Sequence, residues 1–508
     1  MSTHDAETPT VEKHIDEHVE YASKADELVV DTDVKGYTNA NIIIDDATNR
    51  RLLRLINTRV LPCMLMCYFA QALDKGCLGT ASIMGLQADT GMVGQDYALT
   101  NTLLWVGVII GEIPANYLVK ILPLGKFISI SLIAWGIVVL IMSFMRSVPP
   151  IFALRVILGL FESVSGPVLL ATSVMWYKRH EQPLVVSGFQ TMIGFQGIIT
   201  SLLGYGFYHV VDKPLKGWQY MILMISILSI ILGIFIGWWM PDSPTKAKCF
   251  SEEDKLLLVE RVRANDQGIK NVKWIPAQMR EAFTDPLIYM LFFAMVLNTL
   301  ITGGLGAFSA LLINKAFGFD ALNSQLLSMP TGVISMLLLI SSAYVASKTH
   351  QTIWVILALV VPNVVGTIVL ITVTPGPTTR GGLLFCFYIM QCFQAQSPLI
   401  LTVSSRNIAG QTKRVIAYGA TFIGWSGGNA IASQLFQSQW APRYIPSLYA
   451  HLGIYAAFVV LMLCIRALLV HRNKVRDRAA AAAGVEVTHL HAFEDLTDGQ
   501  NPDFRYTL

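Results

Sequence analysis

The sequence contains a series of apolar segments, each long enough to cross the hydrocarbon layer of a membrane as a helix. Crossing about 30 Å of hydrocarbon takes about 20 helical residues. Segments of this length lie near residues 60–80, 97–120, 126–145, 150–176, 184–209, 218–240, 286–312, 324–346, 352–373, 381–404, 415–437 and 448–470. The sequence therefore predicts an all-α membrane protein with about twelve spans, arranged as two six-helix bundles.

The composition excludes several other classes of protein. Only 14% of the 508 residues are charged, whereas soluble domains carry about 25%. The formal net charge is +3 and there is no long basic block, so we expect no nucleic-acid partner. The sequence contains no GxxxxGK[ST] phosphate loop and no HExxH pair, so we expect neither an ATP-driven engine nor an enzyme, and no metal or other cofactor.

The polar segments divide the chain and predict its orientation. We expect a tail over 1–58, bundles over 59–240 and 286–470, a central loop over 241–285, and a second tail over 471–508. Lysines and arginines are more frequent in the loops on the side of the central loop, which predicts that this side and both termini are cytoplasmic. Helical spacing predicts an amphipathic helix over 251–266, capped by Ser251, and a helix over 472–487 that extends from the membrane.

Four ionisable residues lie inside predicted spans of the first bundle. Asp74 and Lys75 are adjacent in the first span, while Arg155 and Glu162 are seven residues apart in the fourth and share a helical face. Charges at this depth are costly, and the four signs sum to zero. One interpretation is a purely structural ion-pair cluster, because mutual pairing lowers the penalty for each charge.

The alternative interpretation is a transport site. An incoming carboxylate competes for Lys75 or Arg155, and the displaced acid then takes up a proton, because burial favours the neutral form. Anion and proton would bind cooperatively, which is what symport requires. We therefore expect Asp74 and Glu162 to carry protons. We expect Lys75 and Arg155 to bind the anion, and the planar guanidinium of Arg155 suits a carboxylate.

Other polar residues within the spans are weaker candidates. Glu112 lies near the cytoplasmic end of the second span, two residues before Pro114, and we favour a gate or interface role over proton binding. Hydrogen bonding between helices explains the neutral residues nearly as well as substrate binding does. The neutral candidates for the substrate site are Gln190, Asn298, Gln391, Gln394 and Asn429, and Gln196 could also face a cavity.

Several short motifs resemble a known family over nearly all of the chain after residue 50. They include QALDKGCLGTA (71–81), GEIPANYLVK (111–120), RVILGLFESVSGPV (155–168), MPDSP (240–244), RNIAGQTKR (406–414) and AFEDLTDGQNPDFRY (492–506). With these motifs the chain resembles the major facilitator superfamily, and within it the anion:cation symporters of the fungal allantoate permease family. The resemblance implies two pseudo-symmetric bundles that alternate access to a central site. It also implies that Asp74 and Glu162 couple protons, and that Lys75 and Arg155 bind the anion.

The function we expect is that of a plasma-membrane importer, active as a monomer, which couples protons to the uptake of a small organic anion. Candidate substrates are allantoate, ureidosuccinate, a vitamin carboxylate and a short peptide. One alternative is a non-transporting nutrient sensor, because the long polar regions carry Thr8, Thr10, Ser251 and Thr497 as sites available for modification. Another is a proton-driven exporter of a metabolite.

Overall fold

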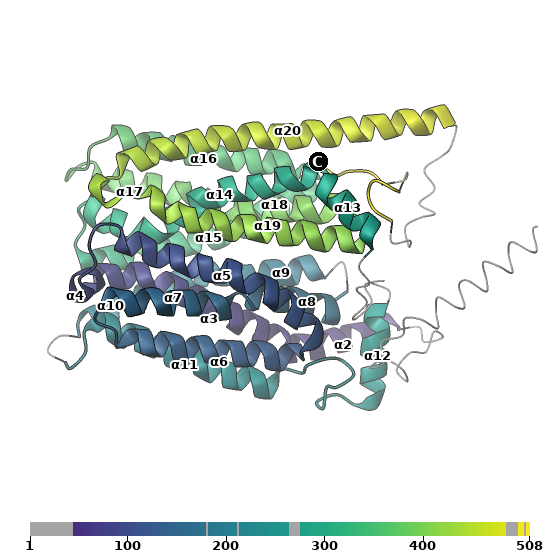
Figure 1. Ribbon diagram of the computed structural model, residues 1–508, viewed down its shortest axis with the longest axis horizontal. Helices are drawn as coiled ribbons and strands as arrows, with labels where there is room; N and C mark the ends of the chain where they lie inside the picture. The colour runs from purple at the N-terminus through teal and green to yellow at the C-terminus, as the bar shows by residue number, and fades with distance from the viewer. Residues whose placement is uncertain (1–43, 179–180, 211–212, 264–274, 484–495, 502–503) are drawn as a thin grey trace, which may run out of the picture.

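The computed structural model describes residues 44–178, 181–210, 213–263, 275–483, 496–501 and 504–508. The regular structure of these residues is helical throughout. Figure 1 shows two helical bundles side by side, with the first half of the chain in one and the second half in the other. We call the end of the molecule that carries α12 (Glu252–Arg263) and the C-terminus the α12 end, and the opposite end, where α4 (Leu86–Thr90) lies, the α4 end.

The first bundle contains six spans, two of which are broken. Its spans are α3 (Leu61–Ile83), α5 (Asp96–Ile121), α6 (Leu124–Ser143), α7 (Val148–Glu162) with α8 (Ser165–Trp176), α9 (Gln182–Gln190) with α10 (Met192–Tyr208), and α11 (Gly217–Trp239). The short helix α2 (Asp46–Arg59) precedes them, capped by the Asp45 side chain.

The second bundle follows α12 and α13 (Pro276–Thr284). Its elements are α14 (Pro286–Leu311) with the π-helix η1 (Leu312–Ala316), α15 (Ala321–Thr349), α16 (Thr352–Thr372), α17 (Arg380–Ile389) with the 3-10 helix η2 (Met390–Ala395) and α18 (Gln396–Asn407), α19 (Gln411–Ala432) with the 3-10 turns η3 (Ser433–Leu435) and η4 (Ser438–Trp440), and α20 (Ile445–Ala483).

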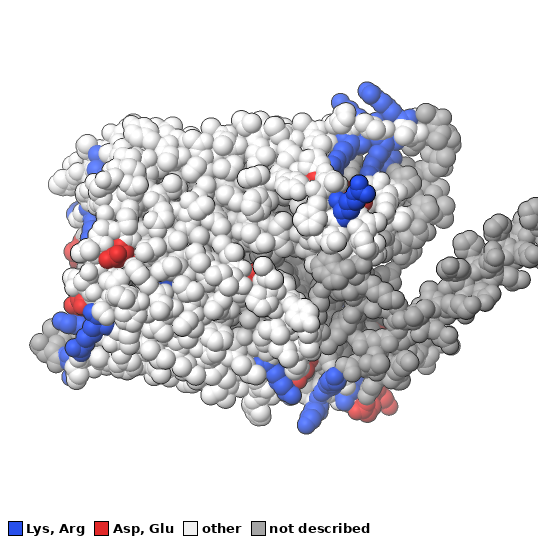
Figure 2. All heavy atoms as spheres, in the orientation of Figure 1, with Lys and Arg blue, Asp and Glu red and all other residues white. Residues whose placement is uncertain are grey.

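The prediction of a twelve-span helical fold is confirmed. Eleven segments of the described residues are long and apolar enough to cross a membrane, and α19, which packs on α14 and α5, completes the set of twelve. α19 is more polar because Gln411, Lys413 and Arg414 occupy its first turn and several glycines follow. In Figure 2 the charged side chains gather at the two ends of the visible face and leave a wide band nearly free of them.

The structure also confirms two smaller predictions. The amphipathic helix appears as α12, with the Ser251 hydroxyl accepting a hydrogen bond from the Asp254 backbone N–H at 3.1 Å. The helix predicted over 472–487 appears as the end of α20, which continues unbroken to Ala483. Residues 264–266 and 484–487 of the two predicted ranges lie outside the described residues.

Two described segments within the predicted C-terminal tail are packed against the second bundle. The segments 496–501 and 504–508, which we call the docked tail, lie against the α12 end of the second bundle. Lys413 holds Asp498 at 2.7 Å, and the Thr352 backbone N–H donates to the Leu508 carbonyl at 2.7 Å. Thr497 is fully buried and donates to Glu281 at 2.7 Å. The expectation that Thr497 is available for modification was therefore wrong, and Thr8 and Thr10 lie outside the described residues.

Candidate functional site

A cavity of about 1760 Å³ lies between the two bundles. Its wall includes residues of α3, α5, α10, α14, α15 and α19, so both halves of the chain contribute to it. The lining continues to the α12 end, where Asp242–Lys246, Arg406, Phe504 and Thr507 belong to it. The cavity therefore extends from the middle of the molecule to the α12 end.

At the level nearer the α4 end, the two bundles contact each other directly. The Tyr97 hydroxyl of α5 donates to the Ala307 carbonyl of α14 at 2.9 Å, and the Thr102 hydroxyl donates to the Ala430 carbonyl of α19 at 2.7 Å. The ring of Tyr97 also packs edge-on against Phe308, with centroids 5.3 Å apart. These contacts close the cavity toward the α4 end.

The centre of the site is an ion pair on the cavity wall. Lys75 Nζ of α3 lies 2.6 Å from Glu162 Oε2 of α7, and both residues line the cavity. Glu162 is the last residue of α7, and its carbonyl accepts hydrogen bonds from the side chains of Gln71 and Ser165. The break between α7 and α8 thus fixes Glu162 opposite α3. Because Lys75 keeps 24% of its side chain exposed while Glu162 has none, the cation is the accessible member of the pair.

Asp74 and Arg155 lie behind this pair. Both are fully buried, and neither belongs to the cavity wall. The Asp74 carboxyl adjoins that of Glu162 and is within electrostatic reach of Arg155 and Lys75. Among the described residues, the Asp74 oxygens and the guanidinium nitrogens of Arg155 find no hydrogen-bond partner. Buried charges without hydrogen bonds are costly, and they are typical of functional rather than structural positions.

The structure thus brings together the four charged residues that the sequence singled out, but it gives them unequal access. Lys75 and Glu162 face the cavity, whereas Asp74 and Arg155 do not. We expected Arg155 to contact the substrate. In this conformation its guanidinium is fully buried and lies outside the cavity wall, so it has no route to a ligand. From this position Arg155 can act on the two acids through its charge.

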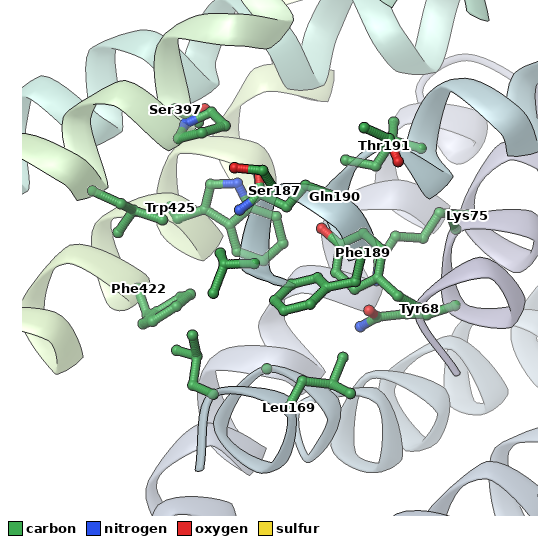
Figure 3. Close-up of a pocket in the computed structure, with 18 of the residues that line it drawn as sticks. Tyr68, Lys75, Leu169, Ser187, Phe189, Gln190, Thr191, Ser397, Phe422 and Trp425 are labelled. Atoms are coloured by element: carbon green, nitrogen blue, oxygen red, sulfur yellow. The ribbon is translucent and has the colours of Figure 1, made fainter. Parts of the chain in front are cut away.

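The remaining predicted residues also differ in whether they line the cavity. Glu112, Gln190, Gln391, Gln394 and Asn429 line the cavity. Asn298 is fully buried outside the cavity wall and donates to the Ser397 hydroxyl at 2.5 Å, so it supports a lining residue instead of lining the cavity itself. Figure 3 shows Gln190 and Ser397 around the space that the Lys75 side chain reaches.

Sequence reasoning missed the aromatic part of the wall. Trp105 of α5 lies beside Lys75, whose Nζ is 5.4 Å from the ring centroid, and Trp105 packs edge-on against Trp425 of α19 at 4.8 Å. Tyr68 and Phe189 form another aromatic pair in the wall, at 5.1 Å. Aromatic residues are common in apolar spans, so nothing in the sequence distinguished these four from residues that face lipid.

A glycine next to the cation allows the fifth span to approach. A Cβ built on Gly76 would lie 1.8 Å from Gln196 Nε2, and Gln196 in turn donates to the Thr200 hydroxyl at 2.7 Å. Any larger residue at position 76 would push Gln196 away from the wall. Within the described residues no cluster of three or more His, Cys, Asp and Glu could hold a metal ion.

Comparison with known proteins agrees with this architecture. An uncharacterised transporter of Schizosaccharomyces pombe is 34% identical, covering 92% of this chain and 91% of the relative. The allantoate permease of Saccharomyces cerevisiae is 29% identical, covering 91% and 87%, and a thiamine pathway transporter of the same yeast is 28% identical, covering 93% and 89%. The inward-open structure of the E. coli xylose transporter matches the fold with a TM-score of 0.61 at 14% identity, over 80% of this chain and 95% of that chain. A family model described as the Major Facilitator Superfamily matches residues 64–433, and the chain belongs to this superfamily of transporters.

Proposed function

We propose that this transporter imports a small organic anion together with protons. The observation that carries the proposal is the Lys75–Glu162 ion pair, 2.6 Å long and set in the wall of the cavity. An ion pair sealed inside a bundle only braces it. A pair whose cation faces a cavity leaves that cation open to a competing anion, and the accessible position of Lys75 therefore favours a transport role over a purely structural one.

The exchange would proceed by competition. When a carboxylate binds Lys75, Glu162 loses its cation and is left beside Asp74. Two adjacent carboxylates in a low-dielectric interior repel each other strongly, so one of them takes up a proton. Arg155, fixed nearby, balances the carboxylate that stays charged. Anion binding thus raises the affinity for a proton, and linkage requires that the proton raise the affinity for the anion equally.

Alternating access would supply the transport step. Contacts between the bundles close the cavity at the level nearer the α4 end, and the cavity lining extends to the α12 end. We assign the α12 end to the cytoplasm because basic loop residues are more frequent on that side, as the rule for cytoplasmic loops requires. The conformation is then inward-facing, in a plasma-membrane protein with both termini inside that works as a monomer. Release of the Tyr97–Ala307 and Thr102–Ala430 contacts would open the other side.

The relatives support an organic substrate. Similarity to an allantoate permease over nearly the whole chain supports an organic anion as the first candidate, and it supports membership of the allantoate permease branch of the superfamily. Ureides, vitamin carboxylates and short peptides all present a carboxylate that Lys75 could bind. Glu112 lines the same cavity, but its carboxylate accepts only from Asn116 at 3.2 Å and forms no ion pair with a described residue. We therefore keep it as a gate or interface residue.

Reconstituted vesicles provide the test. Purified protein is first screened by thermal shift against ureides, vitamin carboxylates, dicarboxylates and dipeptides, because bound ligand stabilises the folded state. The best ligand should then drive proton uptake into proteoliposomes. Asp74→Asn should abolish accumulation driven by a proton gradient while keeping exchange of substrate for substrate. Asp477→Asn, which neutralises an exposed carboxylate outside the cavity wall, serves as the matched control and should leave accumulation intact.

The outcomes separate the alternatives. Binding without any flux would support a sensor instead of a carrier. Proton release from the vesicles that accompanies substrate entry would support an exporter that runs by antiport. Normal accumulation by Asp74→Asn would remove that residue from proton coupling.

A further inference from the structure

The neighbourhood of Lys75 contains more aromatic surface than binding a carboxylate requires. Trp105 lies on one side of it, with Lys75 Nζ 5.4 Å from the ring centroid. Trp105 belongs to the first bundle and Trp425 to the second, and the two rings meet edge-to-face at 4.8 Å and 86°. Both indoles are half-buried and line the cavity, so ring surface from each bundle borders the space beside the cation.

A second aromatic wall continues from Lys75 toward the α12 end. Tyr68 lies seven residues before Lys75 on α3, so the two side chains share one face of the helix. Its ring packs against Phe189 of α9 at 5.1 Å. Figure 3 shows the rings of Tyr68, Phe189, Phe422 and Trp425 around the space that the Lys75 side chain enters. A ligand whose anionic group rests on Lys75 therefore has ring faces and ring edges on several sides.

The charges of the site limit the charge of the ligand. Asp74, Lys75, Arg155 and Glu162 sum to zero, and one singly charged anion that enters with one proton preserves that sum. A dianion would leave an uncompensated charge in a low-dielectric interior or would require a second proton. The second bundle provides no further cation at this depth among the described residues. Its polar lining residues include the uncharged Gln391, Gln394, Ser397 and Asn429.

We propose that the transported anion is a monocarboxylate that carries a flat, unsaturated ring, and that Trp105 and Trp425 select for the ring. The proposal rests on the function proposed above, because it assigns the carboxylate to Lys75. A flat ring can present its face or its edge to the indoles, and aromatic pairs of this kind bind more tightly than the buried area alone explains. A saturated ring of equal size and charge would fill the same space without that gain.

Three simple acids test the proposal on the purified full-length protein in detergent, where membrane permeation of weak acids does not interfere. Benzoate is the flat monoanion, cyclohexanecarboxylate is its saturated counterpart, and phthalate is a flat dianion at neutral pH. We expect benzoate to bind about three- to tenfold more tightly than cyclohexanecarboxylate, as aromatic pairing predicts. Phthalate should bind more weakly than benzoate.

Two variants and a control connect this preference to the indoles. Trp105→Leu and Trp425→Leu should each reduce the preference for benzoate to less than about twofold, mainly by weakening benzoate binding. Trp238, which is 78% exposed on the outer surface, is the matched control, and Trp238→Leu should keep the full preference. Rescue of the preference by Trp105→Phe would confirm that the ring itself, and not folding, is responsible.

The contrary outcomes are distinct from failure of the proposed function. Three outcomes would overturn the proposal of a ring-bearing monoanion: equal binding of benzoate and cyclohexanecarboxylate, tighter binding of phthalate than of benzoate, or no binding of benzoate. With any of these outcomes, the proposed proton-coupled function is still supported if another organic anion drives proton uptake in proteoliposomes. Absence of proton uptake with every anion that binds would instead remove the coupled function on which the proposal rests.

Discussion

Lys413 provides the sharpest test of how the docked tail is held. Its side chain is 1% exposed, and Nζ lies 2.7 Å from Asp285, 2.7 Å from Asp498 and 2.9 Å from Glu281. Lys413→Met keeps much of the side-chain volume but leaves three carboxylates facing one another without their shared cation. Removing one partner from a buried ionic cluster costs about 3–5 kcal/mol.

Contacts that survive the substitution put the expected loss of free energy of tail docking at the low end of that range. Asp285 keeps Arg472 at 2.6 Å, and Asp498 keeps the Tyr506 hydroxyl at 2.9 Å. A loss of about 3 kcal/mol corresponds to about a hundredfold rise in the population in which the tail is detached, since each 1.4 kcal/mol is tenfold. Hydrogen exchange of the docked tail, followed by mass spectrometry, measures this rise directly.

A control in the same segment and a double variant complete the experiment. Asp477→Asn removes the Arg505–Asp477 pair of 2.9 Å, in which Asp477 is 63% exposed, and should change tail exchange by less than about 1 kcal/mol. Adding Asp498→Asn to Lys413→Met should recover part of the loss, because it removes one of the unpaired carboxylates. Exchange in Lys413→Met that matches the wild type would show that Lys413 does not hold the tail in place.

The remaining predictions concern other parts of the structure. A Cβ on Gly194 would lie 2.5 Å from the Gly332 carbonyl oxygen of the other bundle, so Gly194→Ala should cost about 1–3 kcal/mol and lower the melting temperature. Gly206 lies on the same helix, and a Cβ there would meet no packed neighbour within 4 Å, so Gly206→Ala should leave the melting temperature unchanged. Equal melting temperatures for the two variants would contradict the close contact at Gly194. Arg261 is 2% exposed and donates to Asn49 at 2.9 Å, so Arg261→Met should accelerate hydrogen exchange in α12, and unchanged exchange would show that Arg261 does not anchor that helix. Burial opposes ionisation of Asp285, but hydrogen bonds from Arg472 and Lys413 outweigh it and hold the pKa of this carboxyl below its ordinary value of 3.8. Because folding lowers this pKa, the ionised Asp285 stabilises the folded state fully when the pH is above 3.8, and progressively less as the pH falls below that value. Tail docking should therefore be constant from about pH 5 to 8. Detachment on acidification to about pH 6 would exclude Asp285 as the group that controls docking.

The sequence predicted the helical spans well because length and apolarity decide whether a segment crosses a membrane. It also selected the residues that meet at α3 and α7, since Asp74, Lys75, Arg155 and Glu162 are unusual at that depth. It could not predict that Lys75 faces the cavity while Arg155 does not. Neighbours on a helix point about 100° apart, and which of them faces the cavity depends on how the packed helices are rotated.

The docked tail shows a different limit. Its residues have no apolar periodicity, and its partners are dispersed over the chain: Thr352 begins α16, Asn407 ends α18, and Asn473 lies within α20. Asn407 and Asn473 each exchange two hydrogen bonds with the tail backbone, at 2.7–3.0 Å. Pairings over such sequence separations leave no local pattern, so the sequence did not indicate that these residues are fixed against the bundle.

The central claim is that an anion takes the place of Glu162 at Lys75 and that a proton enters in exchange. The most direct measurement is the number of protons taken up on binding, obtained by calorimetric titration of the purified protein with its ligand in buffers of different ionisation enthalpy. We expect the wild type to take up about one proton per anion near neutral pH, and Glu162→Gln to take up close to none. Tight binding by the wild type without any net proton uptake would contradict it.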